Sequence, residues 1–216
     1  MKKIFKLEFV VSAVCFLLFL LLIWLLKVVD VKAIGPQNSY IGLATLNKLF
    51  ADEIGVSKFW YNLTEVLGYI AILTAFCFAI LGLYQLIKRK SFKKVDKNLY
   101  VLLGLYLLIV ITYVLFEKVI INYRPVLNAE LEASFPSTHT MLVLCISGSA
   151  IIEIDRYIKD KKVGLTIKII LFLIILLTVV GRLLSGVHWF TDILGGLLIS
   201  TCFVSLYAGF IRFLNN

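Results

Sequence analysis

The sequence predicts an all-α polytopic membrane protein with six transmembrane helices. Hydrophobic residues make up 61% of the chain, whereas a soluble domain is nearer half apolar. The apolar runs are continuous and long enough to span as helices, while barrel strands would show short alternating patterns. Because backbone groups in lipid must find their partners within the protein, these runs are expected to be helical.

The predicted spans follow one another with polar intervals between them. No linker or internal repeat is visible, so residues 1–216 are expected to form a single membrane domain. The first span suits a retained helix better than the core of a signal peptide. The spans cover approximately residues 9–26, 61–87, 99–121, 140–154, 165–180 and 189–210.

The net charge of +9 arises mainly from Lys and Arg between the spans. This placement argues against nucleic-acid binding, since no single polar domain carries the charge. Short basic loops stay in the cytoplasm. The rule predicts cytoplasmic termini and places three intervals on the extracytoplasmic side, namely 30–60, 122–137 and 182–188.

The interval 30–60 contains a candidate helix that ends at Gly55. Its apolar residues at near-helical spacing are Ile41, Leu46, Phe50 and Ile54. Two interpretations stay open: an amphipathic helix on the membrane surface, or a helix packed within the loop.

The four cysteines each lie inside an apolar run, without metal-ligand spacing. Cys15, Cys77, Cys145 and Cys202 are therefore expected to be small apolar core residues.

Both histidines lie in polar stretches at span ends, where ionisable residues are functional candidates. His188 and Asp192 are four residues apart, so they share a face if the sixth helix starts near His188. A carboxylate that binds one ring nitrogen leaves the other free as a nucleophile. The alternative is a helix-capping aspartate beside an interfacial histidine.

Arg124 and Arg182 are candidate phosphate ligands, because guanidinium binds phosphate in a bidentate way. Arginines at span ends also snorkel to lipid head groups, which is the competing interpretation. Pro136 to His139 stand where the fourth helix is expected to begin, and helix N-termini bind anions. Ser137 or Thr138 is the expected N-cap; the alternative there is a plain cap beside a surface histidine.

Together these residues predict phosphoryl transfer. Arg124, Arg182 and the helix-end amides would hold the phosphate and stabilise charge in the transition state. His188 would attack phosphorus and His139 would protonate the leaving oxygen. Water would then cleave the phosphohistidine.

The residues resemble the type 2 phosphatidic-acid phosphatase (PAP2) family, whose motifs are K-x6-R-P, P-S-G-H and S-R-x5-H-x3-D. Arg124-Pro125 matches the end of the first motif, and Pro136 to His139 match the second with Thr138 for glycine. Arg182, His188 and Asp192 match the third, with Gly181 for serine.

The resemblance implies a helical PAP2-like catalytic core at about residues 99–212. It makes His188 the nucleophile, Asp192 the residue that orients it, and His139 the general acid. The phosphate-binding positions that it implies are Arg124, Arg182, Ser137 and Thr138. The family requires no metal, and no cofactor is expected.

The lysine of the first motif is displaced by one residue. Glu117 stands seven residues before Arg124, where the family has lysine, and Lys118 stands six before it. Six residues on a helix rotate a side chain by roughly a third of a turn from that face. Since 122–125 need not be helical, Lys118 is expected to reach the phosphate; otherwise the pocket is less positive.

The predicted function is hydrolysis of a lipid phosphate or diphosphate at the outer membrane face. Polyprenyl (undecaprenyl) diphosphate is the first expected substrate. Phosphatidylglycerol phosphate, phosphatidic acid and diacylglycerol pyrophosphate are its rivals. The alternatives are a lipid phosphotransferase and a non-catalytic lipid-binding or transport protein. The expected partners are the lipid substrate and membrane lipids.

Overall fold

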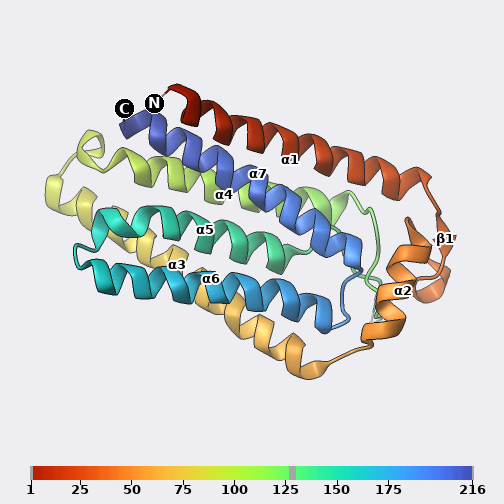
Figure 1. Ribbon diagram of the computed structural model, residues 1–216. Helices are drawn as coiled ribbons and strands as arrows, with labels where there is room; N and C mark the ends of the chain where they lie inside the picture. Colours follow the sequence, from red (N-terminus) through yellow and green to blue (C-terminus); the bar gives the residue numbers. More distant parts are fainter. Residues whose placement is uncertain (1, 127–129, 216) are drawn as a thin grey trace.

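The computed structural model describes residues 2–126 and 130–215, and it consists mainly of long helices (Figure 1). Six of them are long and apolar enough to cross a membrane. These six confirm the all-α class and the predicted number of spans in the described chain. They are α1 (Lys2–Val28), α3 (Lys58–Arg89), α4 (Lys97–Lys118), α5 (Thr138–Tyr157), α6 (Lys161–Leu184) and α7 (Phe190–Asn215).

Shorter elements lie in two of the connections. The α1–α3 connection holds the paired strands β1 (Lys32–Ala33) and β2 (Tyr40–Ile41), the 3₁₀ turn η1 (Pro36–Asn38) and helix α2 (Ala44–Ile54). The α3–α4 connection holds the 3₁₀ turn η2 (Phe92–Lys94).

Helix α5 lies at the centre of the bundle and packs against α3, α4, α6 and α7, while α1 lies along α7. Helices α3 and α4 each pack on α5 more than on each other, and they diverge from their connection (Figure 1). The outward faces carry many exposed Leu, Ile, Val and Phe side chains. Such a surface suits a hydrocarbon solvent, in which only the inner faces need to be close-packed.

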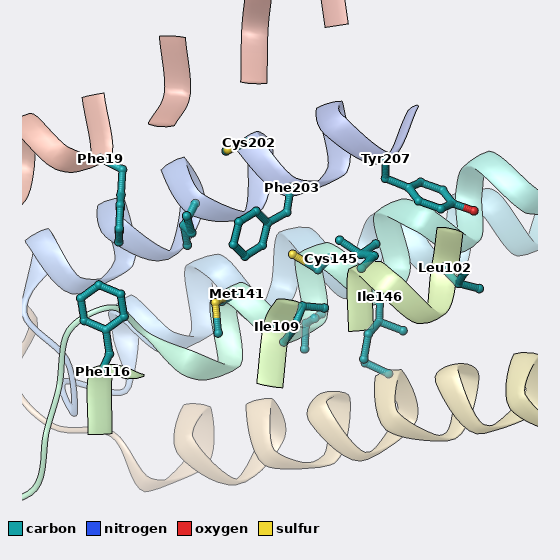
Figure 2. Close-up of a cluster of buried hydrophobic side chains, with 14 of the residues drawn as sticks. Phe19, Leu102, Ile109, Phe116, Met141, Cys145, Ile146, Cys202, Phe203 and Tyr207 are labelled. Carbon is teal, nitrogen blue, oxygen red and sulfur yellow. The ribbon is translucent and has the colours of Figure 1, made fainter. Parts of the chain in front are cut away.

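The core contains a cluster of aromatic and sulfur-bearing side chains (Figure 2). Phe19 and Phe116 meet edge to face with ring centroids 5.7 Å apart. Cys145 and Cys202 are buried there, as predicted. Cys77 is exposed, so its prediction as a core residue was wrong: it lies on a face of α3 that the other helices leave uncovered.

Both termini lie at one end of the bundle, together with the α3–α4 and α5–α6 connections (Figure 1). The α4–α5 and α6–α7 connections lie at the other end, beside α2. The basic segments and the candidate site therefore occupy opposite ends of the protein.

Helix α2 packs against the start of α7. Gly55 ends it, as predicted, with a positive φ of 66°. Asn47 is fully buried; its amide donates to Thr191 Oγ1 at 3.0 Å and accepts from Thr191 N at 3.1 Å. Phe50 and Phe190 stack with centroids 4.2 Å apart. These contacts favour the packed helix over the surface-lying one.

Candidate active site

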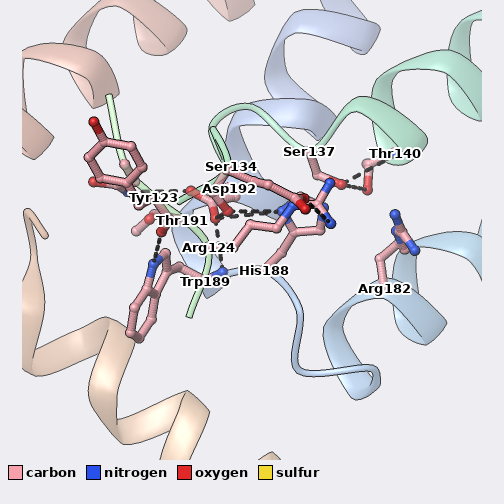
Figure 3. Close-up of polar contacts among 12 residues, drawn as sticks. Tyr123, Arg124, Ser134, Ser137, Thr140, Arg182, His188, Trp189, Thr191 and Asp192 are labelled. Atoms are coloured by element: carbon pink, nitrogen blue, oxygen red, sulfur yellow. Dashed lines mark hydrogen bonds and ion pairs between the residues drawn. The ribbon is translucent and has the colours of Figure 1, made fainter. Parts of the chain in front are cut away.

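Polar residues of the α4–α5 connection, the start of α5 and the start of α7 meet at this end of the bundle (Figure 3). The Trp189 indole donates from Nε1 to the carbonyl of Tyr123 at 2.7 Å. The backbone N–H of Ser137 donates to the carbonyl of Asp192 at 2.9 Å. Hydrogen bonds of this kind fix the α4–α5 connection, the start of α5 and the start of α7 relative to one another.

His188 and Asp192 are connected through Ser134 (Figure 3). His188 Nδ1 lies 3.1 Å from Ser134 Oγ, and that hydroxyl donates to Asp192 Oδ2. The direct distance from Nδ1 to Oδ2 is 3.7 Å, too long for a hydrogen bond. The expected direct pair is thus bridged, because α7 begins at Phe190 and His188 precedes the helix.

The bridge determines which nitrogen of His188 carries a proton. A serine hydroxyl has a single hydrogen, and Ser134 gives it to Asp192. Its oxygen must therefore accept from Nδ1–H of His188. Nε2 is then the unprotonated nitrogen, and it has no hydrogen-bond partner within the described chain. This is the arrangement that a histidine nucleophile needs.

The carboxylate of Asp192 is fully buried and held from two further sides. The backbone N–H of Trp189 donates to Oδ2 at 2.9 Å, and the Asn122 amide donates to Oδ1 at 3.3 Å. Burial lowers the pKa of His188 below its ordinary value, although Asp192 opposes this. His188 is therefore neutral near pH 7, as a nucleophile must be.

His139 has the opposite tautomer. Arg182 Nη2 lies 2.7 Å from His139 Nδ1, and since a guanidinium can only donate, Nδ1 accepts. The ring proton is then on Nε2, which lies 3.2 Å from Glu65 Oε1. Arg182 is fully buried. It belongs to the last turn of α6, where the sequence predicted an interruption, so its placement in a loop was wrong.

Three side-chain nitrogen atoms of the site are buried and lack hydrogen-bond partners in the described part of the chain. They are Nε of Arg124, Nε of Arg182 and Nε2 of His188. Arg124 pairs through Nη1 with Glu132 at 3.1 Å, and with His188 and Thr138 it lines a small cavity. Two fixed cations and a free imidazole nitrogen are suited to a phosphate dianion.

Ser137 is the N-cap of α5, one of the two expected positions. Its Oγ accepts from Thr140 Oγ1 at 3.0 Å and from Thr140 N at 3.5 Å. The oxygen is the acceptor in both bonds, so neither of them uses the hydrogen of the Ser137 hydroxyl. Thr138 lines both the small cavity and a larger neighbouring one of about 350 Å³.

The larger cavity joins polar and apolar surfaces. Glu65, Arg124 and His139 form its polar part. Tyr69 and Ile72 of α3 extend the cavity to the lipid-facing surface, where Tyr69 is 67% exposed and Ile72 is 50% exposed. The polar centre is therefore continuous with a surface that hydrocarbon can contact.

The geometry agrees with the comparisons to known proteins. The family model described as "PAP2 superfamily" matches residues 117–215. Residues 117–215 are thus similar to the PAP2 superfamily. A transmembrane PAP2-type phosphatidylglycerolphosphate phosphatase from Bacillus subtilis superposes with a TM-score of 0.58 at 24% identity, over 93% of this chain and 96% of that one. The two proteins share a fold. No curated protein matches the chain significantly.

The PAP2 lysine position is occupied by a carboxylate that faces the site. Glu117 lines both cavities, whereas Lys118 is exposed and lines neither of them. The one-residue shift places Lys118 on a different face from Glu117, because α4 stays helical through Lys118 and neighbouring residues of a helix point in different directions. The phosphate-binding role predicted for Lys118 has no contact that supports it.

Gly181 replaces the motif serine for a packing reason. A Cβ there would lie 2.6 Å from Thr64 Cγ2 and 3.2 Å from the Trp60 ring. Helix α3 approaches α6 too closely for a larger residue in this protein.

Ser134, Asn122 and Glu65 were not predicted as site residues. Ser134 and Asn122 carry no distinguishing pattern in sequence. Glu65 has a recognisable signal, since an ionisable residue inside a predicted span is by default a functional candidate.

Proposed function

We propose that the protein is a membrane phosphatase that hydrolyses a lipid phosphate or diphosphate through a phosphohistidine. The observation that carries the proposal is the complementary protonation of the two histidines. His188 has a free Nε2 lone pair, and His139 has a proton on Nε2. A nucleophile and a second histidine that can carry a proton, beside two arginines, are the groups that phosphoryl transfer to water requires.

The reaction has two steps. His188 Nε2 forms a bond to phosphorus as the bond to the leaving oxygen breaks, and His139 supplies that oxygen's proton. Water then attacks phosphorus, the N–P bond breaks, and His139 takes the proton of the water. Arg124 and Arg182 stabilise the negative charge throughout, the role that a metal ion fills elsewhere. We therefore propose a metal-independent reaction.

A lipid substrate is supported by the larger cavity, which joins the polar centre to the apolar surface of Tyr69 and Ile72. Undecaprenyl diphosphate is our first candidate. The panel of substrates also includes phosphatidylglycerol phosphate, which the name of the Bacillus subtilis protein gives for that enzyme, as well as phosphatidic acid and diacylglycerol pyrophosphate.

We propose that the site faces outward and the termini face the cytoplasm. The support is the basic charge between α3 and α4 and between α5 and α6, at the end opposite the site, because short basic loops remain cytoplasmic. A C-terminal reporter that is active only in the cytoplasm tests this orientation; an inactive reporter on a folded, membrane-inserted protein would contradict it.

The decisive experiment measures phosphate release by the purified protein across the lipid panel, with and without a chelator. We expect release from at least one lipid, insensitivity to the chelator, and loss of release in His188→Ala and His139→Ala. Ser147→Ala is the matched control, since Ser147 is a buried serine of α5 whose Oγ has no partner in the described chain. Full activity in His188→Ala would refute the mechanism.

A further inference from the structure

Glu65 of α3 contacts both Arg182 of α6 and His139 of α5. Its Oε1 lies 3.2 Å from Arg182 Nη1 and 3.2 Å from His139 Nε2. Arg182 closes the triangle by donating to His139 Nδ1 at 2.7 Å. Helix α3 lies close to the His139 ring at Gly68, where a Cβ would be only 3.1 Å from His139 Cδ2.

In this arrangement His139 is not yet a proton donor. Its Nδ1 accepts from Arg182, so the ring is neutral, and a neutral imidazole does not give up its remaining proton near pH 7. To act as a general acid, the ring must first gain a proton on Nδ1. Arg182 must therefore leave that nitrogen before His139 can protonate a leaving group.

We propose that Glu65 is a positioning residue that keeps His139 in place and balances its charge while Arg182 turns from the histidine to the phosphate. The inference rests on the proposed function. An incoming phosphate dianion draws the guanidinium, which frees Nδ1 to take a proton from water. The imidazolium that results has one carboxylate already beside its Nε2–H, and that carboxylate is Glu65.

The protons balance over the cycle. The imidazolium of His139 gives its Nε2 proton to the leaving oxygen as the P–O bond breaks and His188 Nε2 bonds to phosphorus. His139 is then neutral with its proton on Nδ1, so Nε2 accepts the proton of the attacking water. Release of phosphate lets Arg182 return to Nδ1, and that proton leaves to solvent.

Other charged groups near His139 are less suited to this task. Arg124 and Glu117 line the same cavity, but no hydrogen bond or ion pair joins either to the ring among the described residues. His188 lines the neighbouring cavity. Arg182 carries the wrong charge to stabilise an imidazolium. A carboxylate in contact with the ring is what holds the protonated form.

The competing explanation is that Glu65 only neutralises buried Arg182. The two roles predict different dependences of the activity loss in Glu65 variants on the leaving group of the substrate. General acid catalysis is needed when an alkoxide leaves, and is nearly dispensable when a stabilised phenolate leaves. A residue that acts only through Arg182 and the phosphate would affect both kinds of substrate equally.

The test compares wild type, Glu65→Gln and Glu65→Asp on dioctanoyl phosphatidic acid and on p-nitrophenyl phosphate. We expect Glu65→Gln to lower kcat/KM, which reports the steps up to formation of the phosphohistidine, by roughly 10- to 100-fold for the lipid and by less than about threefold for the aryl phosphate. Glu65→Asp, which keeps the charge, should recover part of the loss on the lipid. If Glu65→Gln does not fold, a larger loss on lipid than on aryl phosphate in Glu65→Asp is the expected result.

Equal losses of kcat/KM on both substrates, or no loss on either, would overturn the inference. Ser147→Ala controls for substitution in the helix bundle. An inactive wild-type protein would instead refute the proposed function and this inference with it, while an active wild type with a normal His188→Ala loss and equal Glu65 effects refutes the inference alone.

Discussion

Replacing Ser134 with alanine removes the hydroxyl that connects His188 to Asp192. The serine is almost fully buried, so water has little access to replace its hydrogen bonds. The His188 Nδ1–H would lose its acceptor at 3.1 Å. Asp192, at 3.7 Å from Nδ1, is too distant to replace it without a shift of α7.

The expected loss follows from the bonds that are broken. A hydrogen bond to a charged group contributes about 1.5–3 kcal/mol, and Ser134 makes one to the Asp192 carboxylate. If this orients the nucleophile in the transition state, kcat should fall by roughly 10- to 150-fold. Asp192→Asn should cost more, because it also removes the charge that stabilises the histidine.

The assay is phosphate release from the best lipid of the panel, with kcat and KM determined separately. Thermal unfolding in detergent identifies variants that simply fail to fold. Ser147→Ala should match wild type in both measurements. Wild-type kcat in a well-folded Ser134→Ala protein would show that the bridge plays no part in catalysis.

Other predictions concern stability, pH and charge. Asn47→Ala should lower the melting temperature, because it leaves buried polar groups of Thr191 without a hydrogen-bond partner. The cost is about 1–3 kcal/mol for each such group. Gly195→Ala should destabilise the protein by about 1–3 kcal/mol, because its Cβ would lie 2.4 Å from a buried phenylalanine ring. Gly104→Ala is the control: its Cβ would have no neighbour within 4 Å, so this substitution should leave the melting temperature unchanged. The lowered pKa of His188 means that the unfolded chain binds a proton first as pH falls below about 6.5; wild type should therefore lose melting temperature over this range, more steeply than His188→Ala. Glu117→Lys should lower the inhibition constant of inorganic phosphate by roughly 2- to 10-fold, and an unchanged constant would place Glu117 outside the phosphate's field.

The spans and the end of the bundle that holds the site could be predicted because their signals are local. Continuous apolar runs locate all six spanning helices, and the spacing of Arg182, His188 and Asp192 marked the stretch from the end of α6 to the start of α7. The errors in detail are local too. α6 continues through Arg182 to Leu184, because a buried arginine with three partners does not need to end a helix in lipid.

The contacts among the site residues could not be predicted in the same way. Ser134 is 54 residues from His188 in sequence, and Glu65 is 117 from Arg182. Their roles depend on how α3, α5, α6 and α7 pack, which hydropathy does not encode. Spacing suggested a direct contact between His188 and Asp192, but it could not reveal that a serine from another segment would lie between them.

The two histidines acquire different chemistry from the kind of partner at Nδ1. At His188 that partner is a hydroxyl whose proton is already given to a carboxylate, so the nitrogen must donate. At His139 it is a guanidinium, so the nitrogen must accept. Tautomers are set by such neighbours rather than by the histidine itself. Two identical side chains can thus serve as nucleophile and proton carrier in one site, and exchanging their Nδ1 partners would abolish both roles.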